Sequence, residues 1–232
     1  MTTCYSQQVR LEPYDLWYSA FMSRLRYNRK QAVDHLRRQC TPLGQVIDDC
    51  GPLKLKVTKG ADLFNALAAA IVYQQLSGKA ASTIHGRFTT LFRDDVPEAA
   101  QASKLSMEQL RGVGLSRNKA LAVQDLAEKS LDGTLLPAHR MSRLDDAQVL
   151  ENLCRVRGIG PWTAQMFLIF NLGRPDVMPA TDLGVQKGVQ AVYRMRKLPT
   201  PEQVLKRTRH LAPYRSAASW YFWWVSDTVL VT

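Results

Sequence analysis

One aspartate, Asp182, stands where a Gly/Pro-rich loop leads into a new helix, within NLGRPDVMPATDLGVQKGVQ (171–190). An aspartate at a helix start accepts backbone hydrogen bonds, and the helix N-terminus stabilises its negative charge. A carboxylate in such a place can also stabilise a cationic transition state and activate a water molecule as a general base. On residue type alone, a capping role and a catalytic role for Asp182 both stay open.

A second feature is the corner VRGIGPWTAQMF (156–167), which sets Gly158 and Gly160 one residue apart before an apolar run headed by Trp162. Both glycines can take positive φ values without a steric penalty, so one helix is expected to end near Arg157 and another to start near Trp162. Such a corner is a helix–hairpin–helix. Its backbone N–H groups can bind a phosphate, and its carbonyls can collect around a monovalent cation. A plain packing turn is the alternative interpretation.

The elements that position these features are expected to be helical, because apolar residues recur at helical spacing along almost the whole chain. ADLFNALAAAIVYQQLSGKAA (61–81) has Asp62 available as the N-cap and places five apolar residues on one helical face: Leu63, Phe64, Leu67, Ile71 and Val72. Only GPLKLKVT (51–58) alternates like a short strand, and LRGVGLSRNKALAV (110–123) echoes the Gly-x-Gly corner. The predicted class is all-α. Further helices are expected at about 29–40, 80–93, 106–111, 117–130, 146–155, 162–171, 183–194, 201–211 and 216–227.

The charge balance points to a polyanionic partner. With 31 Lys and Arg against 20 Asp and Glu, the 232-residue chain carries a net charge of +11, which favours nucleic acid or, failing that, an anionic membrane surface. No apolar stretch approaches the roughly 18 residues that span a bilayer, and the N-terminus lacks the pattern of a signal peptide. We therefore expect a soluble, intracellular protein.

The four cysteines show neither CxxC spacing nor the density of a disulfide scaffold, which indicates a reducing compartment and no zinc or iron–sulfur site. Cys154 is expected to be a buried apolar residue. The four positions are Cys4, Cys40, Cys50 and Cys154.

The order of hairpin, apolar helix, GRPD loop and acid resembles the helix–hairpin–helix/Gly-Pro-Asp superfamily of base-excision DNA glycosylases. Within it the chain is most similar to the alkylbase branch, the 3-methyladenine DNA glycosylase II family. Five blocks in family order carry the resemblance: IVYQQLSGKAA (71–81), LRGVGLSRNKA (110–120), VRGIGPWTAQM (156–166), GRPDVMPATDLGVQKG (173–188) and APYRSAASWY (212–221).

The resemblance implies a monofunctional DNA glycosylase that flips alkylated, cationic purines such as 3-methyladenine and 7-methylguanine out of the duplex and hydrolyses their N-glycosidic bond. Two alternatives stay open. One is a glycosylase for deaminated, oxidised or ethenoadduct bases. The other is a non-catalytic helix–hairpin–helix protein that binds DNA and senses damage.

By position, Asp182 matches the catalytic aspartate of the family. Trp162 stands where the lyase-competent branches keep a nucleophilic lysine, so no Schiff base and no AP lyase activity are expected. The iron-ligating cysteines of some branches are missing as well, so the resemblance implies no Fe–S cluster and no required cofactor. It does leave room for a Na⁺ or K⁺ ion on the backbone carbonyls of Cys154, Val156 and Ile159.

The resemblance also implies a base pocket with aromatic walls. Tyr214 replaces a tryptophan that related enzymes often carry, which leaves the range of lesions open. For Trp220, Phe222, Trp223 and Trp224 a core position is favoured, because a helix rich in aromatic residues normally faces a core. The expected pocket residues are Trp162, Met166, Tyr214, Trp220 and Tyr221.

For DNA binding, the resemblance makes Leu76 the wedge that fills the gap left by the flipped base, although Leu76 could instead be a core residue at a helix end. Gln74 and Gln75 would touch neighbouring bases or sugars. Further DNA contacts are expected at Ser77, Gly158, Ile159, Gly160 and Thr163. At the second Gly-x-Gly corner, Arg117, Asn118 and Lys119 could hold backbone phosphates, as could Lys187, and plain solvated surface is the alternative for these four.

Two helical lobes with the active-site cleft between them are expected. Residues 1–62 would pack with 189–232 as one lobe, and 63–188 would form the central lobe with the helix–hairpin–helix. The expected state is a monomer on double-stranded DNA with alkylated bases and without a membrane. It would lie in the cytoplasm at the nucleoid if bacterial, and in the nucleus if eukaryotic.

Overall fold

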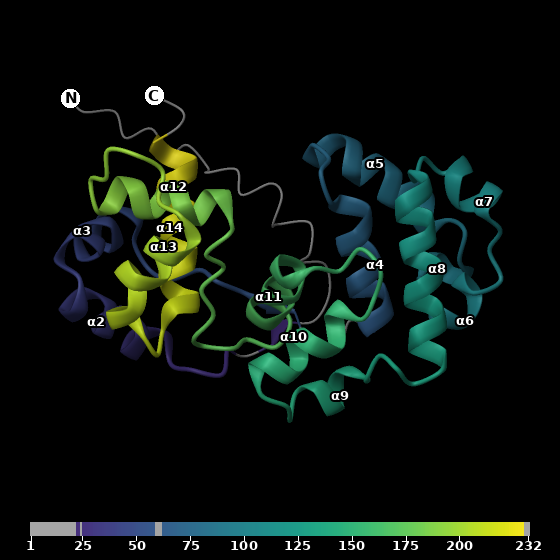
Figure 1. Ribbon diagram of the computed structural model, residues 1–232, viewed down its shortest axis with the longest axis horizontal. Coiled ribbons are helices and arrows are strands. Elements are labelled where there is room, and N and C mark those ends of the chain that lie inside the picture. Colours follow the sequence, from purple (N-terminus) through teal and green to yellow (C-terminus); the bar gives the residue numbers. More distant parts are fainter. Residues whose placement is uncertain (1–21, 24, 59–61, 230–232) are drawn as a thin grey trace. The chain divides into compact units, whose positions relative to one another are not determined.

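The computed structural model describes residues 22–23, 25–58 and 62–229 (Figure 1). These residues form thirteen α-helices, which confirms the all-α class. The helices are α2 (Arg29–Gln39), α3 (Thr41–Cys50), α4 (Leu63–Tyr73), α5 (Gly78–Thr89), α6 (Ala99–Ala102), α7 (Met107–Gly112), α8 (Arg117–Leu131), α9 (Ala138–Met141), α10 (Asp146–Cys154), α11 (Pro161–Phe170), α12 (Leu183–Val192), α13 (Pro201–Thr208) and α14 (Arg215–Val229). Two short 3₁₀ helices, η1 (Arg93–Asp95) and η2 (Arg209–Leu211), complete the helical set. None of the described helices is both long and apolar enough to cross a membrane.

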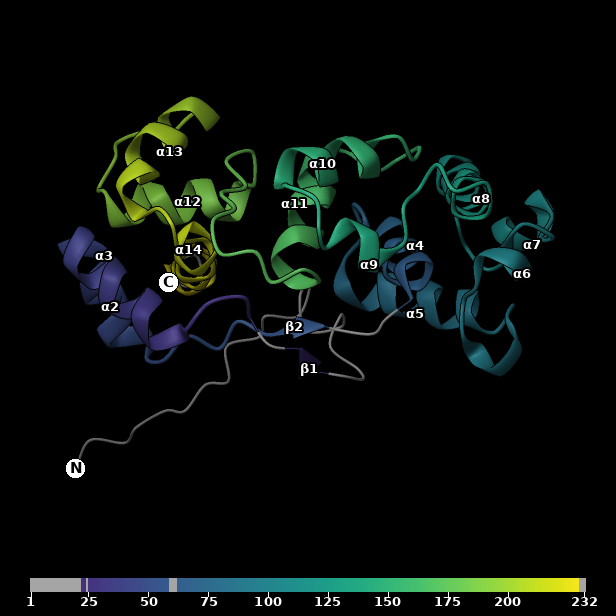
Figure 2. The same ribbon diagram turned by 90° about the horizontal axis from the view of Figure 1, so that it is seen from below.

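The strand observed in the alternating segment 51–58 is shorter than the pattern predicts. Only β2 (Val57–Thr58) pairs, antiparallel to β1 (Met22–Ser23), and both strands are visible in Figure 2. The alternation itself is real, because Leu53, Leu55 and Val57 are buried while the lysines between them are exposed. The segment before β2 is thus an extended linker with one apolar side.

Helix α3 was not predicted from the sequence. Its N-cap, Cys40, makes no side-chain cap hydrogen bond, and Pro42 and Gly44 lie in its first turns, which is a composition typical of a loop. Proline is nevertheless tolerated in the first turn of a helix, where its missing N–H would have no partner. Burial of Leu43 and Ile47 then supplies the stability that local propensity does not.

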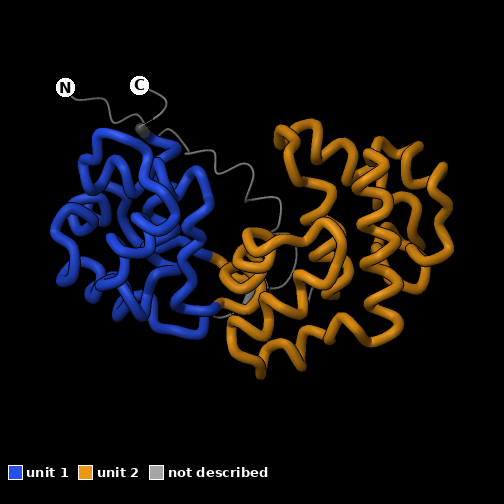
Figure 3. The backbone as a smooth tube through the Cα atoms, viewed as in Figure 1, with its two compact units in different colours: residues 1–15, 25–55, 174–232 blue, residues 16–24, 56–173 orange. Residues whose placement is uncertain are grey.

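The chain divides into two compact units, coloured in Figure 3. Of the described residues, unit 1 contains 25–55 and 174–229, and unit 2 contains 22–23, 56–58 and 62–173. The predicted lobe boundary after residue 188 differs from this division, because α12 packs along α14 within unit 1.

Close packing of α12 on α14 depends on Gly188. A Cβ atom at this position would lie 2.6 Å from the Cα atom of Phe222, so only glycine lets the two backbones approach this closely. Helices α2 and α3 also pack against α14, whose Tyr221 and Phe222 are wholly buried. Helix α14 is therefore the central helix of unit 1.

Unit 2 is built around α4, which packs against α5 and α8. Asp62 caps α4 as predicted, with Oδ2 accepting a hydrogen bond from the backbone N–H of Asn65 at 3.4 Å. The predicted apolar face is buried as well, since Leu63, Phe64, Leu67, Ile71 and Val72 are all at most 8% exposed. Both the cap and the buried face predicted for this helix are therefore confirmed.

Candidate functional site

Asp182 lies in unit 1 as the N-cap of α12, which confirms the capping interpretation. Its Oδ1 atom accepts a hydrogen bond from the backbone N–H of Val185 at 2.8 Å. The residue is only 6% exposed, so its carboxylate has left bulk water. A buried carboxylate at a helix start acts more strongly on nearby charge than the same group on an open surface.

A second donor reaches the same oxygen. The indole Nε1–H of Trp223, which is 3% exposed on α14, donates to Asp182 Oδ1 at 2.8 Å. Gly184 makes room for this contact, because a Cβ atom there would lie 2.8 Å from Trp223 Cδ1 and 3.1 Å from Asp182 Oδ1. The two N–H donors fix one orientation of the carboxyl group, as a catalytic residue requires.

Trp223 is a functional candidate that reasoning from the sequence missed, because it was grouped with the core aromatics of α14. A buried indole N–H needs an acceptor, and this requirement was the available signal. The acceptor, however, lies 41 residues earlier in the chain, where no helical spacing could point to it.

A further carboxylate, Asp227, lies on α14 one turn beyond Trp223. Burial raises the pKa of Asp227, and the negative charge of Asp182 raises it further. A raised carboxyl pKa means that the folded state disfavours the charged form. The position near the C-terminal end of α14 is also unfavourable for a negative charge.

We expect Asp227→Asn to raise the melting temperature at pH 7. The pKa of Asp227 in the folded state lies above the ordinary value of 3.8. Above the folded-state pKa the charged carboxylate therefore lowers the free energy of unfolding. This destabilisation disappears as the pH falls through the folded-state pKa toward the unfolded value. The advantage of the variant should therefore shrink as the pH is lowered toward 3.8. Thermal melts of both proteins across this range measure it, and an advantage that stays constant with pH would contradict the electrostatic cause.

The GRPD loop is tied to the start of α14. Asp176 accepts hydrogen bonds from Arg215 Nε and Nη2, each at 2.7 Å, and the Ser216 hydroxyl accepts one from the Val177 N–H at 2.9 Å. Burial alone would raise the pKa of Asp176, but the hydrogen bonds and charge of Arg215 hold it below its usual range. Two of the sequence blocks thus meet in unit 1, close in the chain to Asp182.

The helix–hairpin–helix lies in unit 2, between α10 and α11. Gly158 has a φ of +78°, as predicted, and the N–H of Ile159 donates to the Val156 carbonyl at 3.1 Å to close the turn. The expectation for Gly160 was wrong: its φ is −99°, in the extended region, because it is the N-cap of α11. A Cβ atom at Gly160 would meet nothing within 4 Å.

The start of α11 lacks a side-chain cap, since Gly160 has no side chain to accept a hydrogen bond. Pro161 follows at the first helical position, where a missing N–H costs nothing. The backbone N–H groups of this first turn are thus not occupied by a capping side chain, as an anion site at a helix N-terminus requires.

The second Gly-x-Gly corner has a different backbone. Here the second glycine, Gly114, takes the positive φ of +104°, whereas Gly112 is the last residue of α7. The Ser116 hydroxyl caps α8 by accepting from the Lys119 N–H at 3.3 Å. The echo in sequence is therefore no structural repeat, and this helix start is occupied by its own serine. Arg117 and Asn118, expected DNA contacts, are exposed beside it.

Gln74 and Lys119, two further expected DNA contacts, are engaged inside unit 2. Gln74 Nε2 donates to the Gly158 carbonyl at 2.8 Å and to the Thr163 hydroxyl at 3.3 Å. Lys119 Nζ donates to the carbonyls of Val72 and Gln74, each at 2.7 Å, and burial lowers the pKa of Lys119. Both side chains brace the hairpin and the end of α4, and their assignment as direct DNA contacts stays a prediction.

The expected wedge is exposed. Leu76 lies in the turn between α4 and α5 and is 38% exposed, so the alternative of a core residue is wrong. Gln75 takes a positive φ of +56°, which is uncommon outside glycine. Ser77 is the N-cap of α5 without a side-chain cap hydrogen bond. On α12 in unit 1, Lys187 is half-buried.

The expected pocket residues differ in exposure. Trp162 is 38% exposed, whereas Met166 and Trp220 are 5% and 8% exposed. Tyr214 packs its ring against Tyr27 and His35, with centroids 5.7 and 5.2 Å away. It is half-buried in unit 1.

Tyr221 requires a correction. It is wholly buried, and its hydroxyl donates to the Gly51 carbonyl at 3.2 Å. It is therefore a core residue of unit 1 and no pocket wall.

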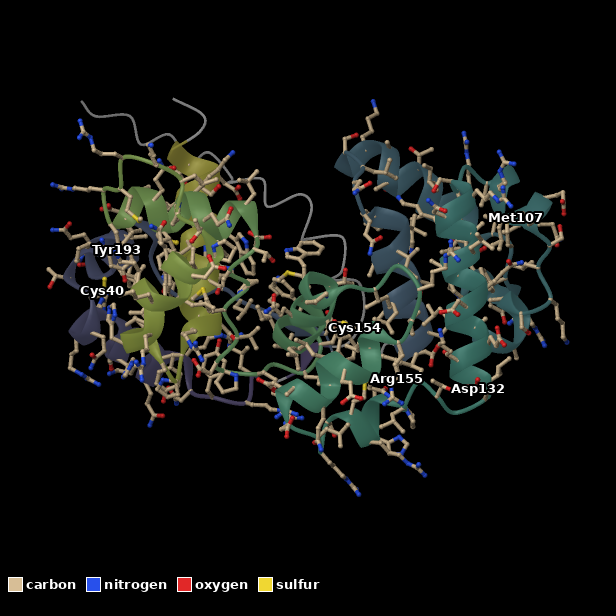
Figure 4. The ribbon with its side chains drawn as sticks, viewed as in Figure 1. Cys40, Met107, Asp132, Cys154, Arg155 and Tyr193 are labelled. Carbon is tan, nitrogen blue, oxygen red and sulfur yellow. The ribbon has the colours of Figure 1, made fainter. Side chains whose placement is uncertain are left out.

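Cys154 also requires a correction. It is exposed at the end of α10 rather than buried. Figure 4 labels Cys154. Cys40 is buried and Cys50 is half-buried, while Cys4 lies outside the described residues. The carbonyls expected to bind a cation, those of Cys154, Val156 and Ile159, all belong to the end of α10 and the hairpin turn.

Comparison with known proteins identifies the class. The model of the HhH-GPD superfamily base excision DNA repair proteins matches residues 68–213, and the chain belongs to this family. DNA-3-methyladenine glycosylase 1 of Schizosaccharomyces pombe is 36% identical over 161 residues, which cover 69% of this chain and 71% of that protein.

Two further similarities cover more of the chain. The alkylbase DNA glycosidase-like protein mag2 of the same yeast is 28% identical over 196 residues, 84% of this chain and 92% of that protein. The solved structure of S. pombe 3-methyladenine DNA glycosylase (Mag1) in complex with abasic DNA superposes with a TM-score of 0.79 at 32% identity. It covers 85% of this chain and 97% of its own. The resemblance inferred from the five sequence blocks is thus confirmed.

Proposed function

We propose that this protein is a monofunctional DNA glycosylase that excises alkylated, cationic purines such as 3-methyladenine and 7-methylguanine. The observation that carries the proposal is the buried carboxylate of Asp182, held by the N–H groups of Val185 and Trp223. The name of one S. pombe relative, DNA-3-methyladenine glycosylase 1, supports the choice of substrate.

The chemistry suits a single carboxylate. An alkylated purine carries a positive charge and is already a competent leaving group, so the reaction needs no strong general acid. As the glycosidic bond breaks, positive charge builds on the sugar, and a buried carboxylate stabilises it strongly because little water screens the interaction. The same carboxylate can then take a proton from the water that attacks the anomeric carbon.

AP lyase activity is not part of the proposal. A lyase step needs an amine that attacks the sugar and forms a Schiff base. Trp162 stands at the position where the lyase-competent branches keep lysine, and an indole nitrogen cannot form that bond. The product should be an intact abasic strand.

The hairpin supplies the contact with the DNA backbone. Backbone N–H groups at the start of α11 favour a phosphate, and no side chain caps them. The carbonyls of Cys154, Val156 and Ile159 offer oxygen ligands, which suit Na⁺ or K⁺, and such an ion would add positive charge facing the same phosphate. Gln74 would hold the turn in shape through the Gly158 carbonyl.

Trp223→Phe should lower the excision rate at saturating enzyme by about tenfold to a hundredfold, because Asp182 loses a donor that helps to orient it. The affinity for undamaged duplex should not change, since the indole is buried at 3% exposure. Single-turnover kinetics and DNA binding measure the two effects. Trp224→Phe, on the same helix, is the matched control, and an equal rate loss in both variants would contradict a positioning role for Trp223.

Leu76→Ala should leave the free energy of unfolding within about 0.5 kcal/mol of wild type, because the side chain is 38% exposed. Excision of a paired lesion should fall by about tenfold, because the wedge offsets an unstacking cost of a few kcal/mol. A lesion opposite an abasic site costs less to flip, so its excision should fall much less. An equal loss on both substrates would remove Leu76 from base flipping.

The alternatives differ in one assay. Release of free bases from methylated, deaminated and ethenoadduct duplexes measures the range of lesions directly. Preference for the methylated purines supports the proposal, and preference for another lesion replaces the substrate. Tight binding of damaged duplex without release of any base would favour a non-catalytic damage sensor. The proposal includes a monomer that acts at the nucleoid of a bacterium or in a eukaryotic nucleus.

A further inference from the structure

One short segment of unit 1 holds a large share of the positive charge. Residues 193–210 contain six Lys and Arg but a single acidic residue, Glu202, which gives +5 of the net +11 of the whole chain. In the part of the chain that the structure describes, no carboxylate pairs with any of the six. The six are Arg194, Arg196, Lys197, Lys206, Arg207 and Arg209, and all are exposed.

This segment forms a groove of about 460 Å³. One wall is a stripe on α13 and η2, because Gln203, Lys206, Arg207 and His210 occupy positions i, i+3, i+4 and i+7 of one helical face. The other wall comes from Tyr193 and Met195, directly after α12. We name it the α13 groove.

In the second wall of the groove, Tyr193 is held in place and uncharged. The Tyr193 hydroxyl donates to the Arg207 carbonyl at 3.3 Å and accepts from Cys40 Sγ at 3.6 Å. Figure 4 labels Tyr193 and Cys40, which lie close together in unit 1. The Arg207 guanidinium carbon lies 5.9 Å from the centre of the Tyr193 ring, and burial raises the pKa of Tyr193, so the phenol carries no charge.

The positive charge in the groove comes from lysine and arginine. Burial, and then the electrostatic influence of His35, lower the pKa of His210 below its ordinary value of 6.5, so this ring is mostly neutral at pH 7. Lys206 and Arg207 both line the groove, so their like charges repel each other across it. An anionic ligand would offset this repulsion, and none is supplied by the described part of the protein.

We propose that the α13 groove binds the phosphodiester backbone of DNA and is a second DNA contact of the protein, on unit 1, whereas the hairpin belongs to unit 2. The assignment rests on the proposed action on DNA. The remaining cations, Arg194, Arg196, Lys197 and Arg209, are exposed in the same segment but do not line the groove itself. Several cations along one segment match the repeated phosphate groups of a DNA backbone better than they match a single phosphate ion.

The test compares two double variants that remove the same charge. Lys206→Gln with Arg207→Gln alters the groove and keeps good helix formers in α13. Arg140→Gln with Arg143→Gln, at the exposed end of α9 in unit 2, is the matched control. Binding of an undamaged duplex is measured by fluorescence anisotropy at several KCl concentrations. Each phosphate contact that is lost should reduce the slope of log K against log[KCl] by about 0.9.

The expected result is a slope smaller by about 1.8 for the groove variant and unchanged for the control. Damaged and undamaged duplex should lose affinity by the same factor, because phosphate contacts carry no information on the lesion. Equal slopes in both variants would overturn the proposal. The proposal would also be overturned if inorganic phosphate bound the wild-type protein without competing with DNA, since the groove would then hold a small anion only.

Two further measurements keep the test decisive. If melting curves show that the groove variant is unfolded, Arg196→Gln with Lys197→Gln removes the same charge outside any helix. A reduced slope is expected for that variant too, and a wild-type slope would count against the proposal. Base excision is assayed separately. A wild-type protein that binds DNA through the groove but releases no base would refute the proposed glycosylase activity, whereas the proposal of DNA binding by the groove would be retained.

Discussion

Asp182→Asn is expected to lower the rate of base release by about a thousandfold or more, which is the scale for loss of a group that stabilises charge in a transition state. DNA affinity should stay close to that of wild type, because one buried charge contributes little beside several phosphate contacts. Single-turnover excision of a methylated purine and anisotropy on the same duplex measure the two effects.

The variant should stay folded. Asparagine is as good an N-cap as aspartate, and its side-chain oxygen can still accept from the N–H groups of Val185 and Trp223. Asp227→Asn removes the same charge close by and is the matched control. Excision near the wild-type rate in a folded Asp182→Asn protein would remove this carboxylate from the mechanism.

Gly160→Asp is expected to weaken binding of damaged and undamaged duplex alike by about tenfold to a hundredfold. At the N-cap of α11 the new carboxylate would accept hydrogen bonds from the first-turn N–H groups and repel a phosphate that needs them. Stability should not suffer, because φ is −99° and aspartate is a slightly better N-cap than glycine.

Two controls separate the causes. Gly160→Ala adds a Cβ atom that meets nothing within 4 Å and should bind DNA as wild type does. Gly160→Asn also caps the helix but adds no charge, so it should lose less affinity than the aspartate variant. If the aspartate variant binds like the alanine variant, the corner is a packing turn only.

Local features of this fold could be predicted from the sequence because they depend on neighbouring residues. Helical periodicity, the caps at Asp62 and Asp182 and the positive φ of Gly158 are of this kind. Gly160 was misjudged because a Gly-x-Gly pattern does not say which glycine needs the unusual backbone, and in the second corner it is the later one, Gly114.

Long-range contacts could not be predicted in the same way. Trp223 reaches Asp182 across 41 residues, and Gln74 reaches the Gly158 carbonyl across 84. The ammonium group of Lys119 donates to two carbonyls at the end of α4, which lie 45 and 47 residues away in the chain. A single sequence gives residue types and spacing, whereas these roles depend on which helices pack together.

The most direct test is a single reaction of the wild-type protein with a duplex that carries one 7-methylguanine or 3-methyladenine, sampled with and without borohydride. For a monofunctional glycosylase we expect release of the free methylated base, a strand that breaks only after treatment with alkali, and no trapped covalent adduct. No released base while the duplex is bound, or a trapped adduct between protein and DNA, would contradict it.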